Sequence, residues 1–318
     1  MGTGSAYGKV ILLGEHAVVY GVPALAVGID RGVRATAKPL GHGPSALSMK
    51  GWGISVDEDD AASDLAGAFR ALLGAVRRDR PRLGAHLLEI EADLPPGGGL
   101  GCSAAMGVAI ARALDGHCSD GVLQERAMAW ERVFHGNPSG IDAAISASGG
   151  CAFFRKGEGL QALRVRGALH LCVASTGSAS GTKTMVDAVM RFRARAPQVV
   201  DDAFEAIRGL VHAARSAIES GDWLSLGRLM DRNQTLLGKL RVSTPEIERI
   251  CGVARDAGAC GAKLTGAGGG GSVVALVTSS VVAQDVLAAW KAAGFDGFET
   301  RVAQPPPRTQ AIESETAP

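Results

Sequence analysis

Two short glycine-rich runs constrain the fold of this chain more than any other feature. Residues 95–103 read Pro-Pro-Gly-Gly-Gly-Leu-Gly-Cys-Ser, and residues 263–271 read Lys-Leu-Thr-Gly-Ala-Gly-Gly-Gly-Gly. Neither run suits the interior of a helix or a strand, because glycine loses much backbone entropy on folding and proline lacks an N–H donor. The chain has 44 glycines, about twice the usual share, yet 46% of its residues are hydrophobic, which excludes disorder of the whole chain.

The apolar patterns around these runs predict a mixed fold. Strands and helices follow one another without strict alternation, which favours an α+β fold over a doubly wound parallel sheet. A polar segment at 156–167 suggests domains at 1–160 and 161–303, and the tail at 304–318, which holds four of the 13 prolines, is predicted to be disordered. We predict strands at 9–13, 33–38, 87–91, 169–173, 272–277 and 297–303, and helices at 65–76, 102–114, 122–133, 204–218, 222–238, 245–257 and 281–293.

Charge and cysteine usage narrow the class of protein. The 33 lysines and arginines nearly balance the 32 aspartates and glutamates, so the net charge of +1 favours neither a nucleic-acid partner nor a membrane surface. No apolar stretch reaches the length of about 18 residues that a membrane span needs. The six cysteines form no Cys-x-x-Cys pair. We therefore expect a cytoplasmic protein with reduced thiols and no nucleic-acid or membrane partner.

The first glycine run is a candidate anion site, because a helical pattern follows it. Glycines let the backbone approach a phosphate, and a helix N-terminus presents free N–H groups and the positive end of its dipole. Ser103 would lie in the first turn, where its hydroxyl could ligate Mg²⁺ or bond phosphate; the alternative is a flexible loop that caps a helix. The spacing fits neither Gly-x-Gly-x-x-Gly, because Cys102 holds the last position, nor Walker A, which disfavours a P-loop ATPase.

Two further segments place polar side chains at the ends of predicted elements. Asp142 follows a turn and begins a short helix, so its carboxylate could accept a proton from a substrate hydroxyl or could cap the helix. Lys9 starts an apolar strand that ends at Glu15 and His16, and the three side chains could hold a polar substrate. The alternative for Lys9 is a strand-end lysine in solvent.

Taken together, these strings resemble the signature motifs of the GHMP small-molecule kinases, in the family's order and spacing. The carriers are Gly-Glu-His-Ala-Val-Val-Tyr-Gly at 14–21, the glycine run continued to Ala-Ala at 95–105, and the second run at 263–271. The fuller strings at 8–26 and 131–142 are most similar to those of the mevalonate kinases in this family. The resemblance implies an α+β fold of two domains, the N-terminal one like domain 2 of ribosomal protein S5 and the C-terminal one ferredoxin-like.

The resemblance also implies a reaction and its participants. The reaction is ATP-dependent phosphorylation of mevalonate at its 5-hydroxyl, in the mevalonate route to isoprenoids, with Mg²⁺ as the cofactor and a homodimer as the frequent assembly. Asp142 would accept the hydroxyl proton, and Lys9 beside it would favour the carboxylate and an alkoxide-like nucleophile. Ser103 and Glu131 would ligate Mg²⁺ as hard oxygen donors. The ATP phosphates would be held by Pro95, Gly97, Gly98, Gly99, Leu100, Gly101, Cys102, Ser103 and Ala104, and the substrate by Glu15, His16, Arg155, Thr182, Gly268 and Gly269.

One residue departs from the family pattern, because Cys102 holds the place of the first of two serines. A helix N-terminus lowers a thiol pKa, so we predict that Cys102 reacts with thiol reagents and that bound ATP protects it.

The sequence is also compatible with other functions. Phosphomevalonate kinase, mevalonate 3-kinase and a sugar kinase share the family pattern, although a galactokinase would carry Asp-Tyr where this chain has Ala17-Val18. A related decarboxylase usually lacks the lysine that corresponds to Lys9. A non-catalytic relative would have lost Asp142, Lys9 or Ser103. A Ser-x-x-Lys hydrolase, suggested by residues 180–183, has no partner motif.

Overall fold

A computed structural model describes residues 1–302 except positions 62, 96, 137 and 179, so the predicted disordered tail at 304–318 lies outside the described residues. Strands and helices form two sheets covered by helices, which confirms the α+β class. Among the helices of this part of the chain, none combines the length and apolar character that a membrane span requires.

The N-terminal sheet is built on a long antiparallel pair, β1 (Gly2–Leu13) and β2 (Ala24–Pro39). On the other edge of β2, β5 (His86–Ala92) pairs with its C-terminal part and β6 (Cys151–Arg155) pairs with its N-terminal part. The strand order is β4-β3-β5-β2-β6-β7, and β3 runs parallel to β5. The remaining members are β3 (Ala46–Met49), β4 (Ile54–Asp57) and β7 (Gly159–Leu163).

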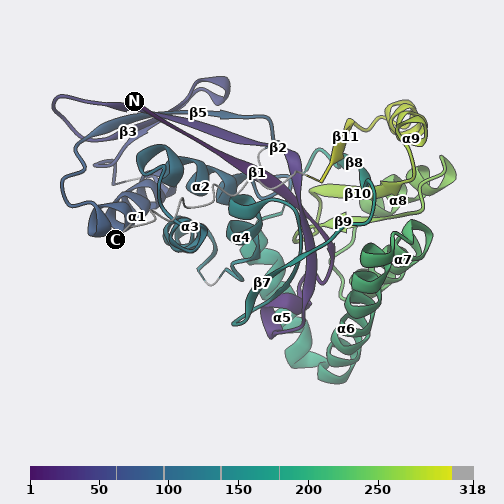
Figure 1. The fold of residues 1–318 in the computed structure, drawn as a ribbon. Coiled ribbons are helices and arrows are strands. Elements are labelled where there is room, and N and C mark those ends of the chain that lie inside the picture. Colours follow the sequence, from purple (N-terminus) through teal and green to yellow (C-terminus); the bar gives the residue numbers. More distant parts are fainter. Residues whose placement is uncertain (62, 96, 137, 179, 303–318) are drawn as a thin grey trace, which may run out of the picture.

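Four helices pack beneath this sheet, as Figure 1 shows: α1 (Asp64–Asp79), α2 (Cys102–Leu114), α3 (Asp120–His135) and α4 (Ile141–Ser148). Ser63 and Ser119 cap α1 and α3 by accepting hydrogen bonds from backbone amides. Short 3₁₀ helices occur at Ala17–Tyr20 and Lys50–Trp52. The C-terminal half of β1 is buried on both faces, because α2 and α4 cover one and C-terminal elements cover the other, so its sequence is a continuous apolar run rather than an alternation.

The C-terminal half forms a four-stranded antiparallel sheet in the order β11-β8-β10-β9. Helices α8 and α9 pack on this sheet, and α6 and α7 form an antiparallel pair beside the end of β1 (Figure 1). The strands are β8 (His170–Ser175), β9 (Gly261–Thr265), β10 (Ser272–Val277) and β11 (Gly297–Arg301), and the helices are α5 (Thr182–Arg195), α6 (Pro197–Ser220), α7 (Trp223–Lys239), α8 (Pro245–Asp256) and α9 (Ser280–Ala292).

The predicted elements agree with the structure where the apolar pattern is long. The expected strand at 33–38 is the end of the longer β2, and β3, β4, β6, β7, β9 and α5 were not predicted. Short strands of mixed pattern carry too little periodicity to be recognised. The predicted boundary after residue 160 falls inside β7, which completes the first sheet, and the division into domains stays a prediction.

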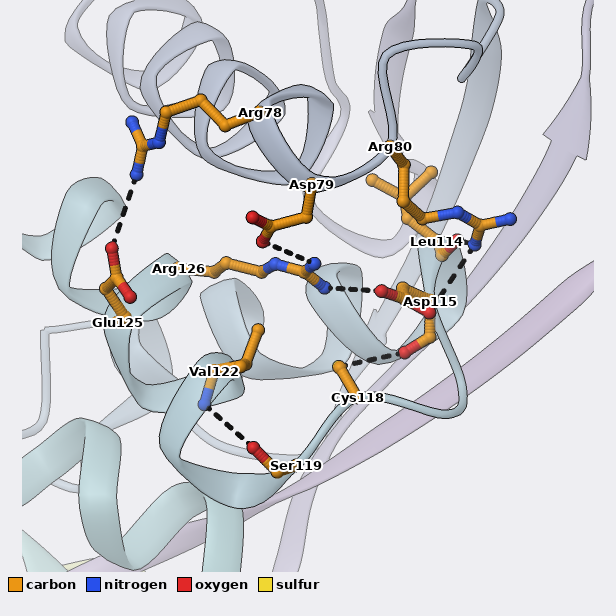
Figure 2. A network of polar contacts seen from close by, with 10 residues as sticks. All are labelled: Arg78, Asp79, Arg80, Leu114, Asp115, Cys118, Ser119, Val122, Glu125 and Arg126. Atoms are coloured by element: carbon orange, nitrogen blue, oxygen red, sulfur yellow. Dashed lines mark hydrogen bonds and ion pairs between the residues drawn. The ribbon is translucent and has the colours of Figure 1, made fainter.

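A buried arginine joins three helices of the N-terminal half and so fixes α3. Arg126 of α3 bonds to Asp79 at the end of α1, at 3.0 Å, and to Asp115 just after α2, at 2.9 Å, as Figure 2 shows. Its side chain is 3% exposed, and a buried charge is tolerated only when it is paired in this way. These bonds fix the position of α3, and Glu131 lies on the same helix, about one and a half turns after Arg126.

Candidate active site

The loop at 95–101 leads from β5 to α2 through several left-handed residues. Gly97, Gly99 and Gly101 have φ values of 69°, 74° and 73°, a region that favours glycine. Gly101 is the N-cap of α2, and the first bond within the helix runs from the Ala105 N–H to the Gly101 carbonyl at 2.9 Å. The amides at 102–104 have no partner within the helix, as at any helix start, and can meet an anion.

Lys9 and Asp142 form an ion pair beside this loop. The Lys9 Nζ lies 3.1 Å from Asp142 Oδ1 and donates to the Gly99 carbonyl at 3.0 Å. The Lys9 side chain is 3% exposed, so its alternative as a lysine in solvent is wrong. Asp142 lies in the first turn of α4, whose N-cap is Gly140, so Asp142 does not cap the helix. Its side chain is 36% exposed, which leaves the carboxylate accessible to a substrate.

Ser103 and Glu131 approach one another from α2 and α3. Ser103 Oγ donates to Glu131 Oε1 at 2.5 Å and accepts a hydrogen bond from Trp130 Nε1 at 3.1 Å. Burial raises the pKa of the Glu131 carboxyl to about 7 and the charge of Asp142 adds to the rise, while the bond from Ser103 and the charge of Lys9 oppose it. The predicted metal ligands therefore lie together, beside the Lys9–Asp142 pair.

The donor set fits a divalent cation. Ser103 and Glu131 supply hard oxygen atoms. Burial and the charge of Asp142 disfavour the ionised form of the Glu131 carboxyl, and a bound cation would stabilise that form. In the described part of the chain, no group of three or more His, Cys, Asp or Glu side chains could hold a metal ion by itself. A cation here would take its other ligands from water and phosphate, which is how Mg²⁺ is usually bound.

Glu15 is fully buried where β1 meets the C-terminal half. It pairs with Lys263 of β9, and Asn233 of α7 donates to its Oε2 at 3.3 Å. Burial raises the pKa of the Glu15 carboxyl and lowers the pKa of the Lys263 amine, while the charge of each group opposes the shift in the other. The predicted substrate residue Glu15 is thus held by two residues of the other half of the molecule.

His16 adopts a left-handed backbone with φ of 60°, which is uncommon for a residue with a side chain. Its Nε2 lies 2.8 Å from the Ala267 carbonyl, and a carbonyl can only accept, so Nε2 carries the hydrogen. Burial lowers the pKa of His16 to about 4, and the ring is neutral near pH 7.

The two glycine runs meet face to face. A Cβ on Gly99 would lie 2.9 Å from the Thr265 carbonyl oxygen, and one on Gly266 would lie 3.0 Å from the Gly99 Cα. A side chain at either position would separate the two loops. This contact brings the second glycine run, which belongs to the C-terminal half, against the predicted phosphate loop.

Gly268 and Gly269 lie farther along the second run. Gly268 packs against the Val242 carbonyl, and the Gly269 carbonyl accepts a hydrogen bond from Ser180 Oγ at 2.7 Å. Neither glycine is among the described residues that line the cavity, where Gly266 and Ala267 represent this loop. Their predicted contact with the substrate finds no support in this geometry.

Among the described residues, a cavity of about 650 Å³ is lined by seven of those predicted for the site, and Gly99 represents the predicted phosphate loop there. Its polar wall comes from the ends of β1, α3, α4 and α5, and its apolar wall from the 3₁₀ helix after β1 and one face of α5. Thr182, the first residue of α5, lies in it as expected. The predicted residues that line this cavity are Lys9, Glu15, His16, Gly99, Glu131, Asp142 and Thr182.

Arg155, predicted to meet the substrate carboxylate, lies outside this cavity lining. It ends β6, where its Nε donates to the Gly21 carbonyl at 3.2 Å and its Nη1 pairs with Glu158 at 2.8 Å. Lys183 of α5, by contrast, is a cation on the cavity wall.

The surroundings of Cys102 oppose the reactivity predicted for it. Burial raises the pKa of its thiol to about 12, and the charges of Asp93 and Glu131 add to the rise. The loss of hydration around a buried thiolate thus acts against the lowering of the thiol pKa that a helix N-terminus produces.

Four residues of the site were not predicted: His135, which lines the cavity, and Trp130, Lys263 and Thr265, which support it from behind. Lys263 and Thr265 are alternate residues of the string before the second glycine run, so a strand there places both on one face, and this signal was available. His135 Nε2 lies 3.5 Å from Glu131 Oε2, one helical turn away. The sequence spacing shows that His135 and Glu131 are neighbours on a helix, but only the structure shows that this face of α3 lies toward the site.

Family models match both halves of the chain. Residues 65–150 match the model described as GHMP kinases N terminal domain, and residues 214–296 match the model described as GHMP kinases C terminal. The chain is 34% identical to a mevalonate kinase of Pyrococcus abyssi, with 94% of this chain and 95% of that protein covered. It is 30% identical to a mevalonate kinase of Homo sapiens, with 95% and 93% covered.

Solved structures show the same architecture. The L. major mevalonate kinase in complex with R-mevalonate superposes with a TM-score of 0.81 at 30% identity, over 96% of each chain. A Streptococcus pneumoniae phosphomevalonate kinase in complex with phosphomevalonate and AMPPNP gives a TM-score of 0.79 at 19% identity, over 95% of this chain and all (100%) of that one. The second likeness concerns the fold alone.

Proposed function

The chain belongs to the mevalonate kinases of the GHMP kinase family, and we propose that it transfers the γ-phosphate of ATP to the 5-hydroxyl of mevalonate. One observation carries the proposal: Lys9 and Asp142 form an ion pair at 3.1 Å, on a cavity that also reaches the glycine loop before α2. An accessible carboxylate beside a buried cation suits the activation of a hydroxyl group.

The residues divide the work of phosphoryl transfer. Asp142 accepts the proton of the substrate hydroxyl as that oxygen forms a bond to the γ-phosphorus, and the bond from this phosphorus to the bridging oxygen of ADP breaks. The positive charge of Lys9 stabilises the ionised Asp142 and the negative charge that develops on the attacking oxygen. Lys9 also bonds the Gly99 carbonyl, so the same side chain positions the base and the glycine loop. Such positioning provides most of the catalysis in phosphoryl transfer.

The glycine loop and the start of α2 are the proposed phosphate site. The amides at 102–104 and the left-handed glycines present N–H groups to the anion. Ser103 and Glu131 would hold a divalent cation, which we infer to be Mg²⁺. When bound, the cation neutralises charge on the phosphate oxygens. The hydrogen bond from Trp130 to Ser103 orients this hydroxyl.

The substrate side of the cavity is formed by Glu15, His16 and Thr182. The L. major relative was crystallised with R-mevalonate, and its likeness to this chain supports the same alcohol here. Lys183 lies on the cavity wall, whereas Arg155 lies outside the lining and pairs with Glu158. We therefore propose Lys183, rather than Arg155, as the cation that binds the substrate carboxylate.

A coupled assay of ADP release tests the proposal with mevalonate, phosphomevalonate, galactose and homoserine as substrates. We expect turnover with mevalonate alone, and a loss of about 10²- to 10⁴-fold in kcat for Asp142→Asn, because this is the usual contribution of a general base. Turnover of another alcohol in place of mevalonate would reject the substrate, and an unchanged kcat in Asp142→Asn would reject the mechanism. Phosphorus NMR of the product separates the 5-phosphate from the 3-phosphate.

Lys9→Met separates the roles of the ion pair. Because Lys9 contacts both Asp142 and the glycine loop, we expect a fall in kcat of about 100-fold together with a higher KM for ATP. A fall in kcat with an unchanged KM for ATP would mean that Lys9 acts on Asp142 and does not position the glycine loop. Homodimerisation and a cytoplasmic location are inferred from the family, and sedimentation velocity tests the dimer.

A further inference from the structure

Lys263 is a fully buried cation to which the mechanism above gives no role. It lies on β9, and its side chain is 0% exposed. Its Nζ pairs with Glu15 and donates to the Leu264 carbonyl at 2.5 Å, with the Ile11 carbonyl at 3.5 Å. The polar partners of this amine among the described residues are thus oxygen atoms at the junction of β1 and β9. Lys263 does not itself line the cavity among the described residues, whereas Glu15 does.

A buried ion pair is weak evidence for stability, because desolvation of the two charges can exceed their attraction. Apolar side chains of similar size would fill this junction without that penalty. The pair can instead fix the direction of a carboxylate, since a charge-assisted hydrogen bond has a defined geometry. Glu15 has a second constraint of the same kind, the bond of 3.3 Å from Asn233 Nδ2.

The supporting groups come from the C-terminal half, although Glu15 belongs to the N-terminal half. Lys263 and Thr265 point to the same face of β9, and Thr265 Oγ1 accepts a hydrogen bond from the Ile11 N–H at 2.8 Å. Farther along, the Ala267 carbonyl holds His16. Lys263, Thr265 and Ala267 thus each bond to the end of β1 or to the residues just after it. Together they fix the position of this part of the substrate wall.

We propose that Lys263, with Asn233, is a positioning residue for the substrate alcohol, and that it acts through Glu15 by holding this carboxylate in place at the wall of the cavity. The inference rests on the proposed function, since it concerns the substrate side of the same site. It assigns to Lys263 a task distinct from that of the Thr265 carbonyl and Gly266, which pack on the phosphate loop.

The kinetic signature of this role is selective. Lys263→Met removes the amine and keeps the length of the side chain, so Glu15 loses its strongest partner. We expect KM for mevalonate to rise by about tenfold or more, as on loss of one charge-assisted hydrogen bond. KM for ATP should stay within twofold, because neither Lys263 nor Glu15 contacts the phosphate loop. A general loosening of the fold would instead change both KM values and the fraction of active enzyme.

A double-mutant cycle with Glu15→Gln tests whether Lys263 acts through Glu15. If it does, Lys263→Met adds less than twofold to KM for mevalonate in the Glu15→Gln background. This double variant also removes both buried charges, so it is expected to fold even if Lys263→Met alone does not. Asn233→Ala supplies a milder perturbation that leaves the ion pair intact, with an expected rise of about threefold.

Asp231→Ala is the matched control, because Asp231 attaches the same helix to the same strand without contact to Glu15. Its Oδ1 accepts from the Ala262 N–H at 2.9 Å and from Arg255 at 2.8 Å. We expect this variant to lower the urea midpoint while KM for mevalonate stays unchanged.

The assays use whichever of the four alcohols the wild type phosphorylates, so that the proposed function and this inference fail separately. Equal rises in KM for Asn233→Ala and Asp231→Ala would overturn the inference, and so would multiplicative effects in the cycle. A rise confined to Lys263→Met and Asn233→Ala that vanishes in the Glu15→Gln background supports it.

Discussion

The contact between the two glycine runs can be tested by adding a single methyl group. Gly99→Ala places a Cβ 2.9 Å from the Thr265 carbonyl oxygen, where ordinary contacts begin at 3.4 Å. The Cβ is attached directly to the backbone and the Thr265 oxygen belongs to it, so no side chain can rotate away. The two loops must therefore separate by about 0.5 Å. The residue also keeps a φ of 74°, which an L-amino acid rarely adopts.

The expected magnitude has two parts. Alanine in the left-handed region costs about 1–2 kcal/mol, of which about 0.4–1 kcal/mol is offset because alanine restricts the unfolded chain. Overpacking against a fixed neighbour adds about 1–3 kcal/mol. We therefore expect Gly99→Ala to lower the free energy of unfolding by about 2–4 kcal/mol. Because the loop amides would shift relative to the phosphates, kcat/KM for ATP should fall by about tenfold or more.

Gly53→Ala is the matched control, since Gly53 has a similar φ of 66° and nothing lies within 4 Å of an added Cβ. It should lose only about 1 kcal/mol and keep its kinetics for ATP. Urea unfolding and the ADP-release assay give both quantities. Equal stability and equal kcat/KM for ATP in Gly99→Ala and Gly53→Ala would refute the prediction, because the contact between the runs would then not shape the nucleotide site.

Two further predictions follow from buried groups. Because burial lowers the pKa of His16 from 6.5 to about 4, the unfolded state binds more protons between these values, and stability falls by up to about 3 kcal/mol as the pH drops from 6.5 to 4. His16→Gln should lack this loss in urea unfolding at pH 7, 5.5 and 4, and an identical pH dependence would contradict the assignment. Because burial raises the pKa of Cys102 to about 12, iodoacetamide at pH 8 should label this thiol only after unfolding. Peptide mapping by mass spectrometry checks this, and rapid labelling of the folded protein that ATP prevents would refute it.

The sequence by itself determined the family, the fold class and the local chemistry. Long periodic segments such as the one that became α1 marked their helices, and the glycine run followed by Ser103 predicted a helix start suited to an anion. These features are local, because periodicity, glycine and the helix N-terminus act within one or two turns of the chain. The same locality explains why the short strands β3, β4, β6, β7 and β9 were missed.

Only the tertiary structure decided which of the candidate groups meet and how each is charged. Lys9 and Asp142 are 133 positions apart in the sequence, and their ion pair depends on where β1 passes α4. Burial is equally non-local: it raises the pKa of the Cys102 thiol where the helix dipole alone predicted a lower one. Lys263 is the clearest case, since a lysine in an apolar strand is paired only through the carboxylate that the other half of the molecule brings to it. Desolvation and pairing depend on the whole fold, and a pattern of neighbours along the chain does not contain them.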